Sequence, residues 1–398
     1  MFNTLLSKFE KPLNMVISID EEAQSIHFYT MDEENKTDIK HDEETYKAAL
    51  FTDEFYEKFE EILTSYHEKN PTEQPPKVAV VIPDKVILFD AINVPVIKKQ
   101  AMTNSLTASL NSLYKNSNDL KFNNVLLGQN KQYATYCAVG IRKIILSKIK
   151  EACENSQYSL SAVTFNSNSV VNGASTFNPD LRTESSLVLD VKGNLTKIAY
   201  VVKGKVCGYY SLPFGYATLY KSRLAAEDLL FEHASAELLV LNAKERAKSR
   251  HLTTLEKSFV LDDNEDDEVD NEEGLVETFT FDKKLGTKKV ARKLPKSMLR
   301  ESPKTREEFV FENFRLFMKW AQDVLIFNPI LTDIGETKTI FINMPREFDY
   351  LFEMANKEVE NIEYKPLIPS DVYDEEVANN LELYGGFYCK QFNKTNTF

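Results

Sequence analysis

Apolar positions in the first 76 residues change from strand-like to helix-like spacing. Residues 15–19 and 25–31 are short apolar and aromatic runs separated by an acidic turn, which predicts a β-hairpin. Between residues 45 and 67 apolar side chains recur at helical spacing, and the breaker-rich sequence NPTEQPP then ends the segment. We therefore expect residues 1–76 to begin a first lobe. Apolar positions within residues 1–12 predict a short helix, which either docks on a partner or membrane surface or packs on the body.

The pattern changes at residue 77 and predicts an inserted α+β subdomain over residues 77–165. The run KVAVVIPDKVILFDAINVPVI contains two strand-like segments separated by Pro83 and Asp84. The expected elements that follow are a helix at 98–114, strands at 122–129 and 131–140, a helix at 141–156 and a strand at 158–165. Residues 166–185 are expected to return to the first lobe.

A second lobe is predicted from residue 186. Three apolar runs separated by turns at 192–194 and 203–205 indicate a meander, and a Gly-free, Pro-free stretch at 220–250 predicts helices. We assign residues 186–242 and 309–373 to this lobe and 374–398 to a C-terminal helix and tail. Later expected elements are a capping box at Thr305–Glu308, a helix through Val324, a strand at 338–342, a helix at 346–359 and a strand at 362–368.

The two parts of the second lobe are separated by a charged insertion at residues 243–308. Residues 262–273 carry nine acidic side chains, and residues 283–300 carry eight basic ones. Charge blocks of this kind cannot pack a core. We expect a partly disordered, solvated loop, with a binding arm in which the two blocks pair as the alternative.

Composition removes several classes of function. The chain has 48 basic and 61 acidic residues and a net charge of -13, which disfavours nucleic-acid binding. The common hydrolase motifs are absent, and we name neither a catalytic residue nor a metal ligand. The five histidines are scattered along the sequence, so we expect ordinary surface or core roles for them. The four widely spaced cysteines are expected to be buried and reduced.

Two segments share one arrangement, in which a strand ends in aspartate and a turn leads into the next strand. They are VISIDEEAQSIHFY, with Asp20, and LVLDVKGNLTKIAY, with Asp190. Actin-like ATPases hold the phosphates of ATP in paired turns of this type, where glycine is needed to leave room for the phosphate. For Asp20 and Asp190 we favour turn stabilisation by the carboxylate over magnesium coordination.

At this point the sequence resembles the PilM family, the actin-like cytoplasmic proteins of type IV pilus assembly, which are related to FtsA. The resemblance is carried in order by MFNTLLSKFEKP, the first hairpin, KVAVVIPDKVILFDAINVP, LVLDVKGNLTKIAYVVKGKVCGYYSLPFG and ELYGGFYCKQFNK. It implies an α/β fold with two actin-like (RNase H-like) lobes and an inserted subdomain in the first. It covers nearly the whole chain.

The ligand loops depart from that family's pattern. Glu21 and Glu22 follow Asp20 where the family has glycine; Lys192 replaces a second glycine, although Gly193 follows it and Thr196 matches. Residues 343–345, Asn-Met-Pro, stand where the family has a Gly-Gly turn around adenosine. The cofactor ligands retained in this degenerate pocket would be Asp20, Asp190, Gly193 and Thr196. We expect no cofactor and disfavour ATP and magnesium, which makes the chain a pseudo-ATPase.

The resemblance implies a cytoplasmic, bacterial scaffold at the inner face of the cell membrane. It would bind the tail of a PilN-like membrane protein in a groove between the first lobe and the insert, reach the membrane through that partner and other pilus components, and bind no nucleic acid. Self-association stays open. The alternatives are a nucleotide-binding switch with weak ATPase activity and an FtsA-like division filament. Against the filament, we expect no amphipathic membrane helix in the closing FYCKQFNKTNTF.

Overall fold

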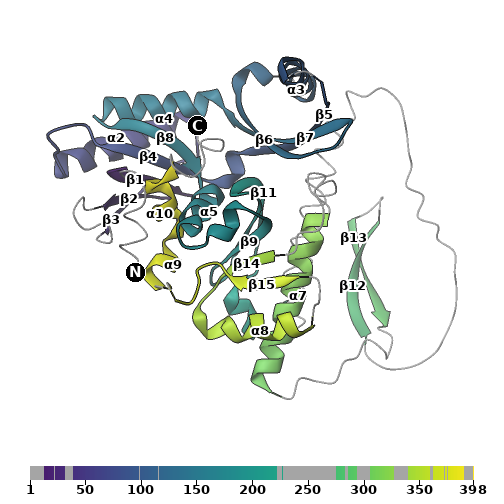
Figure 1. Cartoon of the computed structure of the whole chain (residues 1–398). Coiled ribbons are helices and arrows are strands. Elements are labelled where there is room, and N and C mark those ends of the chain that lie inside the picture. Colours follow the sequence, from purple (N-terminus) through teal and green to yellow (C-terminus); the bar gives the residue numbers. More distant parts are fainter. Residues whose placement is uncertain are drawn as a thin grey trace. The chain divides into compact units, whose positions relative to one another are not determined.

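The computed structural model describes the chain in two compact units, residues 1–230 with 313–398, and residues 231–312. The described residues are 13–21, 23–31, 39–97, 99–114, 116–221, 226, 275–282, 286–293, 305–326, 339–358, 362–371, 373, 375–389 and 398. The expected helices at 1–12 and 220–250 and the acidic block at 262–273 lie outside them, apart from Tyr220, Lys221 and Ala226. Figure 1 labels the elements of both units.

The first sheet has the strand order β3-β2-β1-β4-β8. Its strands are β1 (Met15–Asp20), β2 (Ser25–Met31), β3 (Ile39–Thr45), β4 (Lys77–Ile82) and β8 (Ser159–Phe165). The β1-β2 and β2-β3 pairs are antiparallel, whereas β1-β4 and β4-β8 are parallel. The predicted hairpin is therefore confirmed, and it supplies two of the five strands of a mixed sheet.

Helices α2 (Asp53–Lys69) and α4 (Lys143–Asn155) pack on the first sheet. Tyr66 of α2 stacks on Phe28 of β2 with the ring centroids 4.0 Å apart. The sequence predicted that the first helix begins at residue 45, which is wrong because the polar run 39–45 pairs as an edge strand. The helix begins at Asp53, where the Thr52 hydroxyl caps it by accepting a hydrogen bond from the Phe55 amide.

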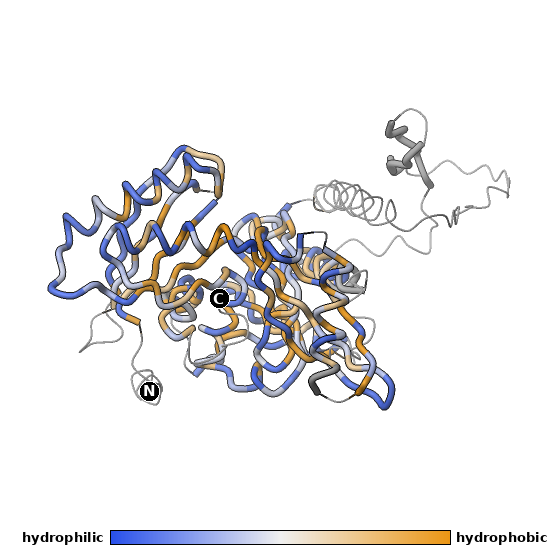
Figure 2. The backbone as a smooth tube through the Cα atoms, turned by 90° about the horizontal axis from the view of Figure 1, so that it is seen from above, coloured by the Kyte–Doolittle hydropathy of each residue, from blue (hydrophilic) through white to orange (hydrophobic). Residues whose placement is uncertain are grey.

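The second sheet repeats this topology in the order β11-β10-β9-β14-β15. Its strands are β9 (Ser185–Val191), β10 (Thr196–Val202), β11 (Lys205–Leu212), β14 (Thr339–Asn343) and β15 (Glu363–Pro366). Again the first three strands form an antiparallel meander and the last two run parallel to the central strand. Figure 2 colours the backbone by hydropathy and shows hydrophobic segments running through the interior of this unit, with hydrophilic ones at its periphery. The chain therefore contains one five-stranded unit twice.

Helices α7 (Arg306–Ile326) and α8 (Asp349–Glu358) follow in the second half of the chain. The predicted capping box is confirmed, because the Glu308 amide donates to the Thr305 hydroxyl and the Thr305 amide donates to the Glu308 carboxylate. Phe317 of α7 stacks on Phe214 beyond β11, with ring centroids 4.9 Å apart. Short 3-10 turns lie at Asp84–Val86 (η1), Ser117–Asp119 (η2), Pro179–Arg182 (η3), Tyr216–Tyr220 (η4) and Arg346–Phe348 (η6).

Helices α5 (Asn166–Phe177) and α10 (Leu381–Phe387) cross at close range and connect the two sheets. Gly173 and Gly385 make the crossing possible, because a Cβ on either would overlap backbone of the facing helix at Leu381 or Ser169. Leu383 and Phe387 of α10 join the core of the first sheet, and α5 contacts β10 and β11 of the second. The expected single helix at 374–389 is two helices, α9 (Glu375–Asn379) and α10.

The insert is smaller than the predicted 77–165. Its separate sheet has the order β5-β7-β6, from β5 (Leu88–Pro95), β6 (Leu120–Gln129) and β7 (Tyr133–Arg142), with α3 (Lys99–Leu113) packed on it. The flanking strands β4 and β8 pair within the first sheet, where the continuous apolar run of β4 suits a strand buried on both faces and β8 pairs beside it. Figure 1 shows this sheet and α3 beside the first lobe.

The second unit contains an antiparallel hairpin within the expected charged loop. It consists of β12 (Leu275–Asp282) and β13 (Gly286–Lys293). Across the described part of the chain, no helix combines the length and the apolar character required to cross a bilayer.

Candidate functional site

Asp20 ends β1 and closes the first loop onto itself. Its Oδ1 accepts a hydrogen bond from the Ala23 amide at 3.0 Å, the contact of a carboxylate that stabilises a tight turn. The Asp20 carbonyl also accepts a bond from the Tyr46 hydroxyl at 3.3 Å. Next to it, Glu21 forms an ion pair with Lys85 of η1, and Glu22 lies outside the described residues. The first loop therefore presents carboxylates and is held by its own lobe.

Asp190 ends β9 in the equivalent position of the second sheet. Its side chain is 6% exposed and accepts a hydrogen bond from Asn343 Nδ2 at 2.8 Å. The same amide nitrogen donates to the Ala378 carbonyl at 2.9 Å, so Asn343 ties β9 to α9. Lys192 Nζ lies 3.4 Å from Asp190 Oδ1 and also 3.4 Å from the Asn379 carbonyl. These protein groups satisfy the carboxylate that would face a ligand.

The second loop is covered by the turn that follows β11. Tyr216 and Ala217 donate their amides to the carbonyls of Lys192 and Gly193, at 3.0 and 2.8 Å. Gly215 is required at this contact, because a Cβ there would overlap both carbonyls. The predicted ligand Thr196 is fully buried and donates its hydroxyl to the Phe214 carbonyl at 2.5 Å. The loop predicted to hold phosphate is thus bonded to the protein's own backbone.

Glu382 of α10 interacts electrostatically with the aspartates at the ends of β1 and β9. Burial raises the pKa of the Glu382 carboxyl, Lys197 and Lys192 oppose that shift, and Asp190 and Asp20 add to it. The structure therefore brings the two predicted aspartates, Asp20 and Asp190, into one charged region between the sheets.

Asp84 belongs to the same region and caps helix α5. Both Asp84 oxygens accept hydrogen bonds from Ser167, one from the amide and one from the hydroxyl, each at 2.8 Å. Burial raises the pKa of this carboxyl, whereas Lys197 and the bonds from Ser167 lower it. Within the described residues, the carboxylates of this region do not come together as three metal-ligand atoms. The sequence gives no signal that places Glu382 in this region. Asp84, by contrast, lies in the segment KVAVVIPDKVILFDAINVP, one of those that carry the family resemblance.

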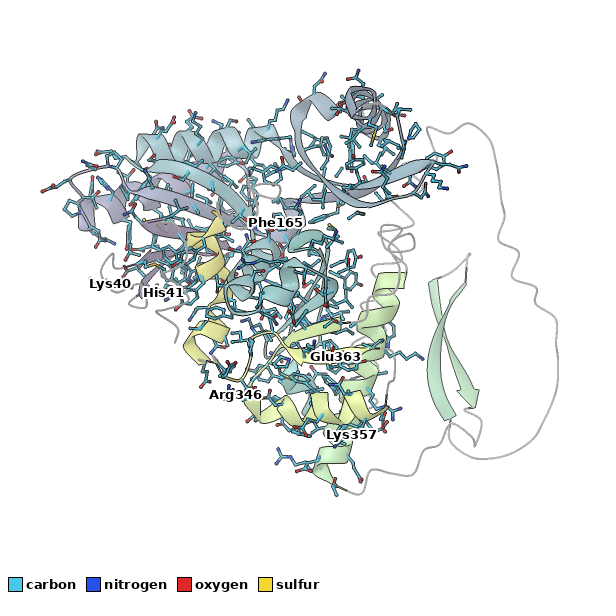
Figure 3. All side chains as sticks on the ribbon, in the orientation of Figure 1. Lys40, His41, Phe165, Arg346, Lys357 and Glu363 are labelled. Atoms are coloured by element: carbon cyan, nitrogen blue, oxygen red, sulfur yellow. The ribbon has the colours of Figure 1, made fainter. Side chains whose placement is uncertain are left out.

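The position expected to hold adenosine is filled. Asn343 and Met344 are buried, with exposed fractions of 7% and 6%. Arg346, labelled in Figure 3, and Tyr373 line a pocket beside them. This pocket encloses only about 10 Å³, enough for one water molecule. Arg346 lies over the Tyr373 ring at 4.2 Å and donates to the Ser370 carbonyl. Sites for drug-sized ligands are usually about 300–1,000 Å³. In the conformation described, this pocket is far smaller than such sites.

Two copies of one five-stranded mixed sheet, with α5 and α10 between them and the ends of β1 and β9 facing the same region, define the actin-like, two-lobed α/β fold. The predicted fold class is confirmed. No protein-family model matches the chain, and no curated protein sequence matches it.

Comparison with solved structures finds likeness at low sequence identity. A chain of a PilM-PilN type IV pilus biogenesis complex aligns over 96% of this chain and 99% of its own length, with 10% identity and a TM-score of 0.49. MreB5 of Spiroplasma citri bound to AMPPNP aligns over 96% of each chain, with 12% identity and a TM-score of 0.35. The ethanolamine utilization protein EutJ from Carboxydothermus hydrogenoformans covers 96% and 95%, with 11% identity and a TM-score of 0.31. At these identities each likeness concerns the fold alone.

Proposed function

We propose that this chain is an actin-like scaffold of a type IV pilus or related secretion-type machine and that it works without ATP hydrolysis. One observation carries the proposal: the loops that would hold a nucleotide are bonded to the protein itself. Asp190 is paired with Asn343, and the carbonyls of Lys192 and Gly193 accept bonds from residues 216 and 217. A ligand would have to break these bonds before it could form its own.

Charge supports the same proposal. A polyphosphate between the sheets would approach Asp20, Asp190 and Glu382, with Glu21 on the adjoining turn. Like charges at short range in a poorly solvated region cost more than they do in water. Lys192 and Lys197 offset part of this charge but already lie close to these carboxylates.

The partner in this proposal is the cytoplasmic tail of a PilN-like membrane protein, bound between the first lobe and the insert. An extended peptide can add a strand to an open sheet edge and gain affinity through backbone hydrogen bonds. Strand β8 is such an edge, and Phe398 of this chain already pairs with it. The Phe398 amide donates to the Val163 carbonyl at 2.9 Å, and the Val163 amide donates to the Phe398 carbonyl at 3.1 Å. Lys121 of the insert lies over the Phe398 ring, 5.9 Å from its centroid.

Calorimetric titration with synthetic cytoplasmic tails of PilN-like proteins tests this proposal. We expect one tail to bind per chain, and the full-length protein to retain the partner in a pull-down. A lack of binding to the tail of every inner-membrane pilus component would refute the scaffold role. The cytoplasmic position at the membrane would follow from that partner, and self-association would be measured by light scattering in the same samples.

A nucleotide-binding switch is the second candidate. It is favoured by the presence of Lys192 and Lys197 beside the ends of β1 and β9, where cations could contact phosphate if the lobes opened. Such a protein would bind Mg-ATP with weak or no hydrolysis and change its lobe closure. It differs from the scaffold in one measurable property, which is nucleotide affinity.

A further inference from the structure

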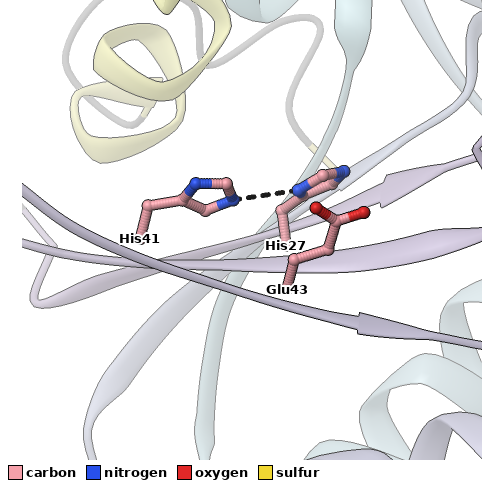
Figure 4. Close-up of side chains that lie close together, drawn as sticks. All are labelled: His27, His41 and Glu43. Atoms are coloured by element: carbon pink, nitrogen blue, oxygen red, sulfur yellow. Dashed lines mark hydrogen bonds between the residues drawn. The ribbon is translucent and has the colours of Figure 1, made fainter.

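Two histidines that are 14 residues apart come together on the first sheet. His27 lies on β2 and His41 on β3, and Figure 4 shows the two rings facing each other with Glu43 beside them. In the antiparallel register His27 is opposite Glu43, and Tyr29 is opposite His41. Side chains two residues apart on a strand share a face, so all three polar groups lie on one side of the sheet.

The distances between these groups match the size of a metal site. His27 Nδ1 and His41 Nε2 are 3.0 Å apart, and the ligand atoms of His27, His41 and Glu43 all lie within 4.8 Å of one another. Zinc binds nitrogen and oxygen ligands at about 2.0–2.2 Å, which places tetrahedral ligand atoms about 3.3 Å apart. A small side-chain rotation of Glu43, which is exposed, would complete this arrangement.

Neighbouring groups hold the His27 ring in a suitable orientation. His27 Nε2 lies 2.9 Å from the hydroxyl of Ser25, which is fully buried. When Nε2 carries the ring proton and donates it to Ser25 Oγ, the lone pair of Nδ1 points towards His41. Metal-bound histidines commonly have this kind of hydrogen bond on the other ring nitrogen.

His41 stacks on Tyr29 with ring centroids 4.5 Å apart, which restrains the second imidazole. Within the described part of the chain, Glu43 has no cationic partner, so its carboxylate is open to a cation.

We propose that His27, His41 and Glu43 form a binding site for a divalent transition-metal ion such as Zn²⁺. The ion would take the place of the hydrogen bond between the two rings. His41 would then hold its single ring proton on Nδ1 instead of Nε2, His27 would keep its own on Nε2, and both imidazoles would stay neutral. Two imidazoles and one carboxylate suit zinc, copper or nickel and not magnesium or calcium, which prefer oxygen ligands. Because the His41 and Glu43 side chains are exposed, a fourth position is left for water or a further ligand.

This site lies on the face of the first sheet that packs against α10, as Tyr29 belongs to the core cluster with Leu383 and Phe387. A bound ion would tie the edge strand β3 to β2 at that face. The proposal goes beyond the scaffold role and does not depend on it, because it uses neither the nucleotide loops nor the β8 edge.

Zinc titration of the full-length protein tests the proposal. The chain is prepared without a polyhistidine tag, stripped with EDTA, and titrated with ZnCl₂ by calorimetry; CoCl₂ is used in parallel because its visible absorption reports the ligand geometry. We expect one equivalent of Zn²⁺ to bind and the melting temperature to rise with it. His41→Asn and Glu43→Gln should each weaken binding at least about tenfold, and Ser25→Ala by about tenfold.

Glu44→Gln is the matched control. Glu44 is the next residue on β3, points to the opposite face and pairs with Lys69 of α2 at 2.8 Å, so its loss should leave zinc affinity unchanged. His41 and Glu43 are exposed, and their variants are expected to fold, which circular dichroism verifies. The proposal is overturned if the wild type takes up no stoichiometric zinc. It is equally overturned if His41→Asn binds zinc as the wild type does, since the ion would then lie elsewhere, for example at the acidic residues 262–273.

Discussion

Asp190 and Asn343 form the contact on which the interpretation of the ligand region depends. Asp190 ends β9, Asn343 ends β14, and the parallel register of these strands places the two residues side by side. Asn343 thereby occupies one side of the carboxylate that an actin-like ATPase would direct towards its ligand. The Asn343 amide gives the Asp190 carboxylate a hydrogen-bond partner within the protein.

Replacement of Asn343 by alanine should destabilise the protein by about 1–3 kcal/mol, because it removes the amide that donates to both the buried Asp190 carboxylate and the Ala378 carbonyl and leaves Lys192 beside the carboxylate. Urea unfolding followed by circular dichroism measures the change. Asn93→Ala is the control, since Asn93 is an exposed asparagine that bonds only across the insert to Thr135. Equal unfolding midpoints for the two variants would contradict the assigned role of Asn343.

At the residue scale, sequence patterns located strand ends but not their partners. Asp20 and Asp190 could be placed because each follows an apolar run, and both lie at the end of a strand. The bond from Asn343 to Asp190 could not, because it joins residues 153 positions apart through parallel pairing. The same limit applies to His27 and His41, whose proximity depends on the register of β3 against β2.

Helices α5 and α10 determine how the two sheets are joined. Their backbones approach at Gly173 and Gly385, and the Ser169 hydroxyl donates to the Glu382 carbonyl at 2.6 Å across the same contact. A contact this close leaves no room for a side chain. Its geometry therefore fixes the separation between the sheets.

Gly385→Ala should destabilise the protein by about 1–3 kcal/mol or more, because the added methyl overlaps the Ser169 carbonyl and must push the helices apart. Thermal or urea unfolding measures the loss. Gly128→Ala is the matched control: it lies at the irregular position of β6, and its added methyl would meet no atom within 4 Å. If both alanine variants unfold alike, the helix crossing is not as tight as described.

Strand β8 provides the element-scale test of partner binding. Because Phe398 occupies the edge of β8 at Val163, removal of residues 390–398 should free that edge and strengthen binding of a PilN-like tail several-fold. Calorimetric titration of the full-length and shortened chains with the same peptide gives the comparison. Weaker binding after the deletion would show that these residues contribute to the partner site instead of competing for it.

Elements with clear periodicity could be predicted, whereas polar or ambiguous ones could not. The meander at 185–212 follows from its three apolar runs and the turns between them, and the capped helix α7 follows from the Thr305 capping box. Strand β3 was missed because its polar residues carry no strand signal, and α5 because its sequence NSNSVVNGASTF has low helix propensity. Both elements are stabilised by tertiary pairing. The division between insert and first lobe likewise depends on which sheet a strand joins.

For the whole molecule, duplication of one five-stranded topology explains why the ligand region lies where it does. The central strands β1 and β9 hold equivalent places in the two sheets and carry their aspartates towards the same region. The fold of an actin-like ATPase is thus kept. The groups in that region, however, bond to one another, and the pocket beside Asn343 has room for about one water molecule. The scaffold role depends on this combination.

Calorimetric titration of the full-length protein with Mg-ATP tests this account most directly. The scaffold predicts no saturable heat and no rise in melting temperature up to millimolar nucleotide, because binding would have to break the bonds of Asp190 and separate paired charges. Bovine serum albumin and a nucleotide-binding actin-like protein serve as negative and positive controls. One-to-one binding of Mg-ATP in the micromolar range, abolished by Asp190→Asn, would contradict the account and favour the nucleotide-binding switch.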